Sequence, residues 1–167
     1  MKMLTGLLCA GAAVVAGLVS YPASAATADG AQIRDLESRF AAAVAARDVD
    51  AIMKAYSADV FVFDLTPPRQ YVGAAAYRDD WKAFVAGFNG PIQFTLSDVV
   101  VTTQGDVAYG HSIQHIAGVD PKGGKVDMTV RVSDVYRKSG ANWLIVQEHV
   151  SVPIDLATGK PDMTSKP

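Results

Sequence analysis

The sequence is poor in cysteine, has no apolar segment long enough to span a membrane, and has no block of positive charge. Its single cysteine, Cys9, lies in an apolar run near the N-terminus. A mature chain without that run would contain no thiol, which excludes disulfides, cysteine nucleophiles and cysteine-based zinc sites. The 167 residues carry a formal net charge of −2. Without a basic cluster, nucleic acid is not an expected partner.

The first 25 residues have the three parts of a secretory signal peptide. Lys2 gives a basic start, residues 4–19 are apolar, and the cleavage pattern of small residues is Ala23-Ser24-Ala25. A membrane-spanning helix needs about 20 apolar residues, and this run is shorter, so a retained anchor is the weaker alternative. We expect cleavage near Ala25, a periplasmic or secreted bacterial protein, and no membrane contact after signal removal.

Hydrophobic periodicity predicts three helices in the first half of the chain. Apolar residues at helical spacing indicate a helix near 29–46, and Asp48 suits the N-cap of a short second helix. Gly73 precedes a third helix with an aromatic stripe, which ends at 89–91. Between the second and third helices, a strand at 60–64 stops before two prolines, which cannot continue a ladder.

The second half predicts four long strands rich in β-branched residues, separated by glycine-containing turns. Their expected ranges are 92–103, 107–117, 126–138 and 141–152. Helices followed by an antiparallel meander indicate an α+β fold, with the helices packed on one face of a curved sheet. We expect a single domain over 26–157 and a frayed tail over 158–167.

The last predicted strand carries chemically useful side chains at every second position. Because side chains alternate along a strand, one face is expected to carry Trp143, Ile145, Gln147, His149 and Ser151. The other, mostly apolar face is expected to carry Leu144, Val146, Glu148, Val150 and Val152. This pattern suits a strand that lines a pocket on one side and packs or dimerises on the other.

The order of these elements resembles the SnoaL-like family, which belongs to the superfamily of ketosteroid isomerase and nuclear transport factor 2. The residues that carry the resemblance are Arg47-Asp48-Val49-Asp50, Tyr56-Ser57-Ala58-Asp59 before Phe61-Val62-Phe63-Asp64, Gly73, and Trp143 to Pro153. The resemblance implies a cone-shaped half-barrel: a curved, mainly antiparallel sheet packed against about three N-terminal helices around a deep pocket, often as a homodimer. Members include isomerases, polyketide cyclases and dehydratases, so the fold alone does not fix the function.

By the same resemblance, Asp64 stands where isomerases place the aspartate that moves a proton beside a carbonyl. A carboxylate suits this task if its surroundings raise its pKa. The alternative is that Asp64 only starts the turn before Pro67, since aspartate is a favoured turn residue.

Two further positions of the isomerase, a tyrosine and a protonated aspartate that hold the enolate oxygen, correspond to Phe40 and Arg131. Phe40 has no hydroxyl, and Arg131 is a permanent cation, which argues against classical ketosteroid isomerase activity. The strand register implied by the family resemblance turns Arg131 inward, together with residues 127, 129 and 133. The alternative is the ordinary antiparallel pattern, in which this polar face meets solvent and the core receives Val126, Met128, Val130 and Val132.

His149 can act as a base, an acid or a hydrogen-bond donor near neutral pH, or serve as a structural residue. The ligand-binding residues we expect beside it are Phe40, Tyr56, Tyr77, Trp81, Gln147 and Ser151. His111 and His115 are four residues apart on one strand, about 13 Å at strand rise, so we expect no metal site. No cofactor is expected.

These residues predict proton-transfer isomerase or lyase chemistry on a small hydrophobic or carbonyl-bearing molecule. Asp64 or His149 would be the base, and Arg131 would hold the developing oxyanion. One alternative is a non-catalytic module that binds a small hydrophobic or anionic ligand. Another is a dimeric assembly module that uses an apolar outer sheet face, composed of Val126, Met128, Val130, Leu144 and Val146.

Overall fold

The structure, a computed structural model, describes residues 28–165. The predicted signal peptide at 1–25 lies outside these residues. Within them, no helix is both long and apolar enough to cross a membrane.

Three helices pack together on one side of the molecule: α1 (Ala28–Ala45), α2 (Val49–Met53) and α3 (Ala74–Ala86). The apolar stripe of α1 buries Ile33, Leu36 and Phe40, as its helical spacing predicts. Asp48 caps α2 as expected, since its side chain accepts a hydrogen bond from the backbone N–H of Ala51 at 2.9 Å.

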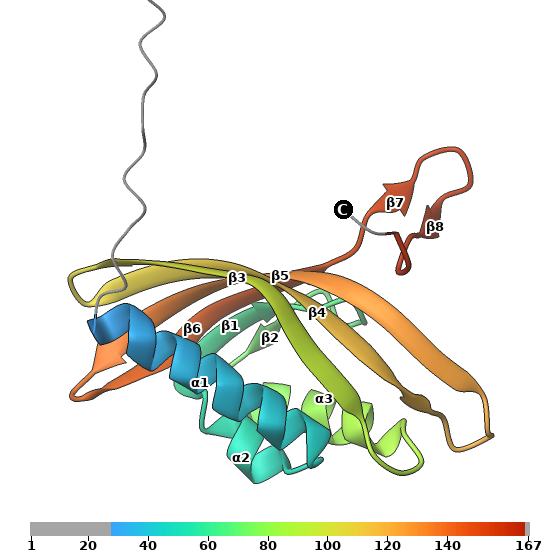
Figure 1. Cartoon of the computed structure of the whole chain (residues 1–167), viewed down its shortest axis with the longest axis horizontal. Helices are drawn as coiled ribbons and strands as arrows, with labels where there is room; N and C mark the ends of the chain where they lie inside the picture. Colours follow the sequence, from blue (N-terminus) through green and yellow to red (C-terminus); the bar gives the residue numbers. More distant parts are fainter. Residues whose placement is uncertain (1–27, 166–167) are drawn as a thin grey trace, which may run out of the picture.

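Six strands form one sheet, with the order β2-β1-β6-β5-β4-β3. All neighbouring pairs are antiparallel except β1 and β6, which are parallel. The strands are β1 (Tyr56–Phe63), β2 (Tyr71–Val72), β3 (Gln93–Gln104), β4 (Val107–Val119), β5 (Lys125–Ser139) and β6 (Asn142–Ser151). The predicted α+β class, with a mainly antiparallel curved sheet and three helices before the meander, is confirmed (Figure 1).

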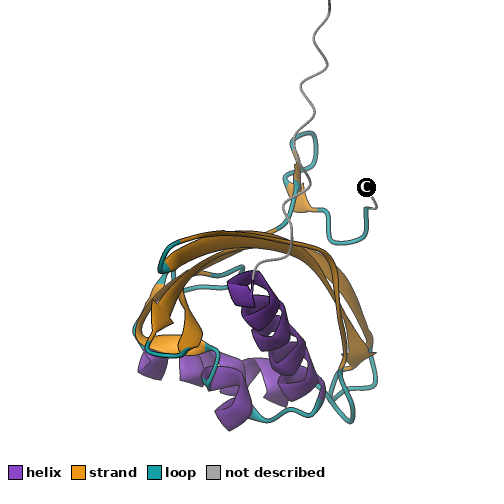
Figure 2. Cartoon of the chain, turned by 60° about the vertical axis from the view of Figure 1, so that its left-hand side comes forward, coloured by secondary structure: helices purple, strands orange, loops and turns teal. Residues whose placement is uncertain are grey.

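The sheet bends into an arch over the helices, and the core lies between its concave face and α1 and α3 (Figure 2). Side chains from both the helices and the sheet are buried from solvent in this core. The largest fully buried ones include Tyr77, Ile33, Ile52 and Ile145. The concave face is therefore the interior face, and a strand residue belongs to the interior only if its side chain points to that side.

A β-bulge in β6 decides which residues of this strand point inward. Val135 pairs with Gln147 while Tyr136 pairs with Ile145, which leaves Val146 as an extra residue. An extra residue shifts the alternation of side chains by one position. Ile145 is buried before the bulge, and Glu148 is buried after it.

The C-terminal segment is ordered into a second small sheet rather than a frayed tail. Strands β7 (Ile154–Asp155) and β8 (Lys160–Pro161) pair as a hairpin that projects from the main sheet (Figure 1). The chain then returns to the sheet, where the carbonyl of Met163 accepts a hydrogen bond from the N–H of Thr129 at 2.8 Å. Where a frayed tail was expected, β8 and the contact of Met163 with β5 thus fall within residues 160–163, because β5 extends beyond the end of β6 and offers this backbone donor.

Candidate functional site

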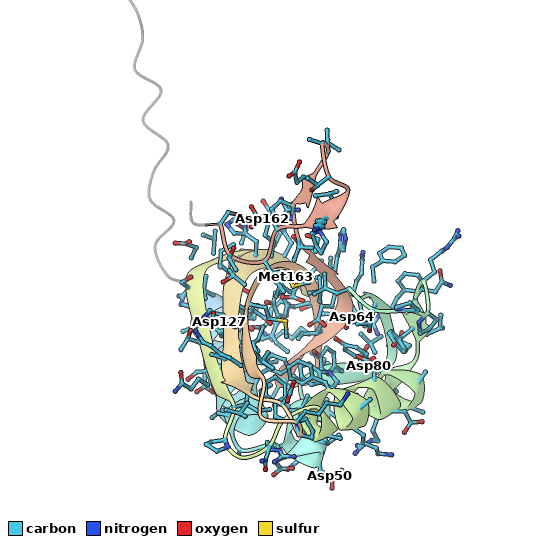
Figure 3. All side chains as sticks on the ribbon, turned by 90° about the vertical axis from the view of Figure 1, so that its right-hand side faces the viewer. Asp50, Asp64, Asp80, Asp127, Asp162 and Met163 are labelled. Carbon is cyan, nitrogen blue, oxygen red and sulfur yellow. The ribbon has the colours of Figure 1, made fainter. Side chains whose placement is uncertain are left out.

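A cavity of about 430 Å³ lies between the concave face of the sheet and α3. Its volume is within the range of small-molecule sites, roughly 300–1,000 Å³. In Figure 3, Asp64, Asp80 and Met163 lie around the interior at this open end of the arch. Aromatic and aliphatic side chains dominate the lining, which includes Phe40, Trp81, Phe84, Phe94, Ile116, Met128, Val130 and Val150.

One face of α3 supplies a continuous part of this lining. Tyr77, Asp80, Trp81 and Phe84 follow one another at helical spacing and all line the cavity. The aromatic stripe of the third predicted helix is thus both core and cavity wall. The predicted ligand-binding residues Tyr77 and Trp81 lie in the cavity wall, and so does Phe40 from α1.

Asp64 lies just after the end of β1, at the cavity. Its Oδ1 accepts a hydrogen bond from the backbone N–H of Leu65, and its Oδ2 lies 3.1 Å from the hydroxyl oxygen of Tyr77. Burial raises the pKa of the Asp64 carboxyl, and the nearby Asp80 adds to this effect. The geometry fits a carboxyl group whose proton affinity is raised towards that of a general base.

Glu148 is a second carboxyl in the cavity wall, and it is 3% exposed. The hydroxyl of Tyr77 lies 2.6 Å from its Oε1, and the hydroxyl of Tyr56 donates to its Oε2 at 2.9 Å. Burial raises the pKa of Glu148 to about 8, although both tyrosines act in the opposite direction. Tyr56, a predicted ligand-binding residue, therefore lies behind Glu148 and outside the cavity lining.

Sequence reasoning missed Glu148, although the sequence contains a signal for it. The alternation in the last strand places this glutamate among Leu144, Val146, Val150 and Val152, an otherwise apolar set. A single acid among apolar residues of a strand indicates a buried, hydrogen-bonded carboxyl more often than a solvated one.

A further pair of buried acids lies deeper in the core, beside Glu148. Asp134 pairs with Glu148 across β5 and β6, and burial raises the pKa of Asp134 well above its usual range. The hydroxyl of Tyr136 donates to Glu37 Oε1 at 2.9 Å and lies 3.4 Å from Asp134 Oδ2. The interior thus holds Glu37, Asp134 and Glu148 together, which favours neutral forms for most of them.

Two polar groups in the cavity wall make no hydrogen bond to other residues of the described range. Gln114 on β4 is 7% exposed, and no such bond involves its side-chain amide. The indole N–H of Trp81 is buried without an acceptor. The Trp81 N–H has no accessible surface, whereas the Gln114 amide lies in the cavity wall and is free to donate a hydrogen bond to an acceptor oxygen of a ligand.

Four predicted site residues do not face the cavity: Arg131, Gln147, His149 and Ser151. Arg131, Gln147 and His149 are exposed, Ser151 is half-buried, and none of the four lines the cavity. For β6 the reason is the bulge at Val146, which sends the residues after it to the opposite faces from those that simple alternation predicts. His149 instead packs its ring edge-to-face with Phe63, with 5.7 Å between ring centroids.

For Arg131 the inward register was wrong, and the ordinary antiparallel pattern holds. Val130 and Val132 are buried, while Arg131 and Ser133 are exposed. An arginine turned inward would leave a desolvated cation beside apolar side chains, which costs more than exposing it. Asp64 and His149 do not face each other across one cavity, so the predicted convergence of acid, base and cation is not present.

The predicted apolar outer face is corrected for its three β5 residues, whereas Leu144 and Val146 of β6 are half-buried and are not part of the core. Val126, Met128 and Val130 belong to the interior side, where Met128 and Val130 line the cavity. The convex face carries polar residues at these strands, including Arg131 and His149, both exposed.

A larger hollow of about 670 Å³ lies outside the arch, between α1, α2 and the turn that joins β5 to β6. Its polar lining residues include Asp35 and Arg39, which form an exposed ion pair at 2.8 Å. These groups satisfy each other and keep contact with water. The candidate site is therefore the interior cavity, where buried titratable groups and unpaired donors meet.

Comparison with known families identifies the domain. The model of the SnoaL-like domain matches residues 33–155, whereas a search of curated proteins gives no match. A solved NTF2-like protein of unknown function from Pseudomonas putida KT2440 is 30% identical, with 82% of this chain and 95% of that chain covered and a TM-score of 0.74.

More distant structures share the fold. A proposed dehydratase of the NTF2-like family from Streptomyces avermitilis is 21% identical, covering 76% of this chain and 98% of its own, with a TM-score of 0.67. A ketosteroid isomerase-like protein from Erwinia carotovora atroseptica is 18% identical, covering 72% and 93%, with a TM-score of 0.63. At these identities the likeness concerns the fold alone.

Proposed function

The chain belongs to the SnoaL-like family of the NTF2-like superfamily, and we propose that it catalyses proton transfer on a small, uncharged carbonyl compound, in an isomerase- or dehydratase-type reaction. The observation that carries the proposal is Asp64, a carboxyl with a raised pKa at an aromatic cavity that also contains the unpaired amide of Gln114. A base and a hydrogen-bond donor in one apolar cavity are the minimum needed to form an enolate.

The charge of the cavity selects the ligand class. Its described lining includes the acids Asp64, Asp80 and Glu148, and no lysine, arginine or histidine. An anion would meet like charge at low dielectric without a compensating cation. An uncharged ligand is therefore favoured over the anionic one considered from the sequence.

In the proposed reaction, the Asp64 carboxylate removes a proton from the carbon next to the carbonyl. The electron pair of the C–H bond moves into the enolate, whose oxygen accepts a hydrogen bond from the Gln114 amide. In an isomerisation, Asp64 then returns the proton to another carbon. In a dehydration, it gives the proton to the departing hydroxyl group, which leaves as water, and Asp64 is again a carboxylate.

A hydrogen-exchange assay tests the proposal with a panel of carbonyl compounds. Small uncharged ketones, enones and β-hydroxy ketones are incubated with the protein in D₂O, and deuterium at the carbon next to the carbonyl is measured by mass spectrometry. We expect catalysed incorporation for part of the panel, and a loss of roughly 10²- to 10⁴-fold in rate for Asp64→Asn, the usual range for general base catalysis.

The matched control is His149→Gln, because this exposed residue lies on the convex face. Its exchange rate should equal that of the unaltered protein. Equal rates for Asp64→Asn and the unaltered protein would overturn the proposed role of Asp64.

Phe40 favours a second candidate, a non-catalytic binding module. This residue lines the cavity and cannot donate a hydrogen bond to an enolate oxygen. Ketones that raise the melting temperature without any deuterium incorporation would favour this second candidate. A homodimer stays a proposal, and any dimer through the convex face would bury the polar residues found there.

A further inference from the structure

Two carboxyl groups approach the same tyrosine hydroxyl at the cavity. The hydroxyl oxygen of Tyr77 lies 3.1 Å from Asp64 Oδ2 and 2.6 Å from Glu148 Oε1. The second oxygen of Glu148 lies 2.9 Å from the hydroxyl oxygen of Tyr56. Asp64 follows β1, Tyr77 belongs to α3 and Glu148 to β6, so three separate elements bring this chain of oxygens together.

The number of protons available to this chain of oxygens limits its charge. Three oxygen–oxygen contacts are within hydrogen-bond distance, and each needs one proton. The two tyrosines supply one proton each, so the third must come from a carboxyl. With both carboxyls ionised, one contact would lack its proton and two like charges would flank one hydroxyl in the interior.

Burial decides which carboxyl holds the proton. Glu148 is 3% exposed, whereas Asp64 is half-buried at the cavity and accepts a backbone N–H. The charged form is favoured where desolvation is smaller, so the charge belongs on Asp64. The high pKa of Glu148, about 8, agrees with this assignment.

The other groups that act on Glu148 do not reverse this order. Asp134 faces it from β5 and Glu37 lies nearby on α1, and both are buried acids without an ion pair within the described chain. On the Asp64 side, the carboxyl of Asp80 accepts a hydrogen bond from Tyr71 at 2.7 Å. No cation contacts either end of the chain of oxygens in residues 28–165, so nothing there offsets a second negative charge.

We propose that Asp64 and Glu148 share a single proton through Tyr77, and that Glu148 holds it while Asp64 faces the cavity as a carboxylate. When Tyr77 passes its hydroxyl proton to Asp64, it takes the proton of Glu148 in exchange. Asp64 then becomes a neutral acid and Glu148 a carboxylate, with no change in total charge. Glu148 is thus a positioning residue; its use in catalysis rests on the proposed function, whereas the shared proton does not.

The composition of the chain makes this proton accessible to experiment. The sequence contains only two glutamates, Glu37 and Glu148, so the full chain labelled with ¹³C at the glutamate side-chain carboxyl gives two carboxyl resonances. Glu148→Gln assigns them by the loss of one resonance. A pH titration of the unaltered protein then yields the midpoint of Glu148 directly.

The decisive variant is Asp64→Asn. Its amide donates to the Tyr77 oxygen, so the tyrosine proton serves Glu148 and the third proton is no longer needed. We expect the Glu148 midpoint to fall by about one pH unit or more, a tenfold loss in proton affinity, as for a coupled pair. Asp64→Ser also removes the carboxyl and should lower the Glu148 midpoint by the same amount. It replaces Asp64→Asn in the experiment if circular dichroism shows that the asparagine variant folds poorly.

The matched control is Asp80→Asn, which removes a cavity carboxyl that is hydrogen-bonded to Tyr71 and not to Tyr77. Its effect on the Glu148 midpoint should be much smaller than that of Asp64→Asn. In Tyr77→Phe, which removes the bridge, the effect of Asp64→Asn should largely disappear. If the Glu148 midpoint is unchanged in Asp64→Asn or Asp64→Ser, the shared proton is overturned, whatever the deuterium assay shows. If the midpoint shifts but the protein catalyses no deuterium exchange, only the proposed function is contradicted.

Discussion

At the scale of single residues, Glu148 makes stability depend on pH. Its pKa is about 8 in the folded protein, against an ordinary value of 4.5, chiefly because burial disfavours its charge. Between these two values the folded state keeps a proton that the unfolded chain releases. The folded state therefore loses relative stability as pH rises through this window.

The variant Glu148→Gln removes this titration and keeps the shape of the side chain. We expect its free energy of unfolding, relative to the unaltered protein, to rise between pH 5 and pH 8. One pKa unit corresponds to about 1.4 kcal/mol, so the gain should reach a few kcal/mol at most. Urea unfolding at a series of pH values measures it. Asp106→Asn, in the exposed turn between β3 and β4, is the control, and parallel pH profiles for Glu148→Gln and the unaltered protein would contradict the expectation.

At the scale of elements, the C-terminal segment after β6 completes the cavity wall. Met163 lines the cavity, and its backbone carbonyl is bound to the free edge of β5 at Thr129. The hairpin before it is highly exposed, with Leu156 at 94%. The segment is thus fastened by few contacts at a cavity entrance, whereas the core lies in the elements from α1 to β6.

Removal of the Met163 side chain should open the cavity without unfolding the protein. Trp81 lines this cavity, whereas Trp143 is buried outside its lining, with its indole N–H donated to Asp29 at 3.1 Å. In Met163→Ala we expect acrylamide to quench tryptophan fluorescence more strongly. The free energy of unfolding should change by no more than about 1.5 kcal/mol, because full burial of a methionine contributes only about 1.5–3 kcal/mol and this one is half-buried. Leu156→Ala is the matched control, and equal quenching in both variants would show that Met163 does not cover the entrance.

At the scale of the whole molecule, the sheet forms an arch over the helices (Figure 2). The residues of β5 and β6 that point away from the helices include the exposed Arg131 and His149. The predicted signal peptide at residues 1–25 lies outside the described part of the chain, so export stays a prediction.

We expect export with cleavage after Ala25 in a bacterial host. N-terminal sequencing of the protein recovered outside the cytoplasm should begin at Ala26. Replacing Ala23 and Ala25 by leucine should retain the heavier precursor, because cleavage needs small residues at these two positions. Ser24→Leu, between them, should be processed normally. Recovery of the unprocessed chain in the cytoplasm would contradict this prediction.

The sequence by itself determined the elements and the fold. Helical spacing gave α1 and α3, β-branched runs between glycine turns gave β3 to β6 with ends within a few residues, and ordered short motifs gave the family. These features depend on neighbours along the chain, which the sequence contains. Among the site residues expected from the sequence, Phe40, Tyr77 and Trp81 line the cavity from the apolar faces of α1 and α3, and Asp64 lines it from the position directly after β1.

Only the tertiary structure decided which polar residues of β5 and β6 share the cavity. One extra residue, Val146, exchanges the faces of the strand beyond it, so Glu148 points inward and His149 outward. A bulge is set by the pairing of β6 with β5, a contact between distant parts of the chain that simple alternation does not predict. The pKa of Glu148 likewise depends first on its burial and then on its contacts with Tyr77 and Tyr56, all of which only the folded chain provides.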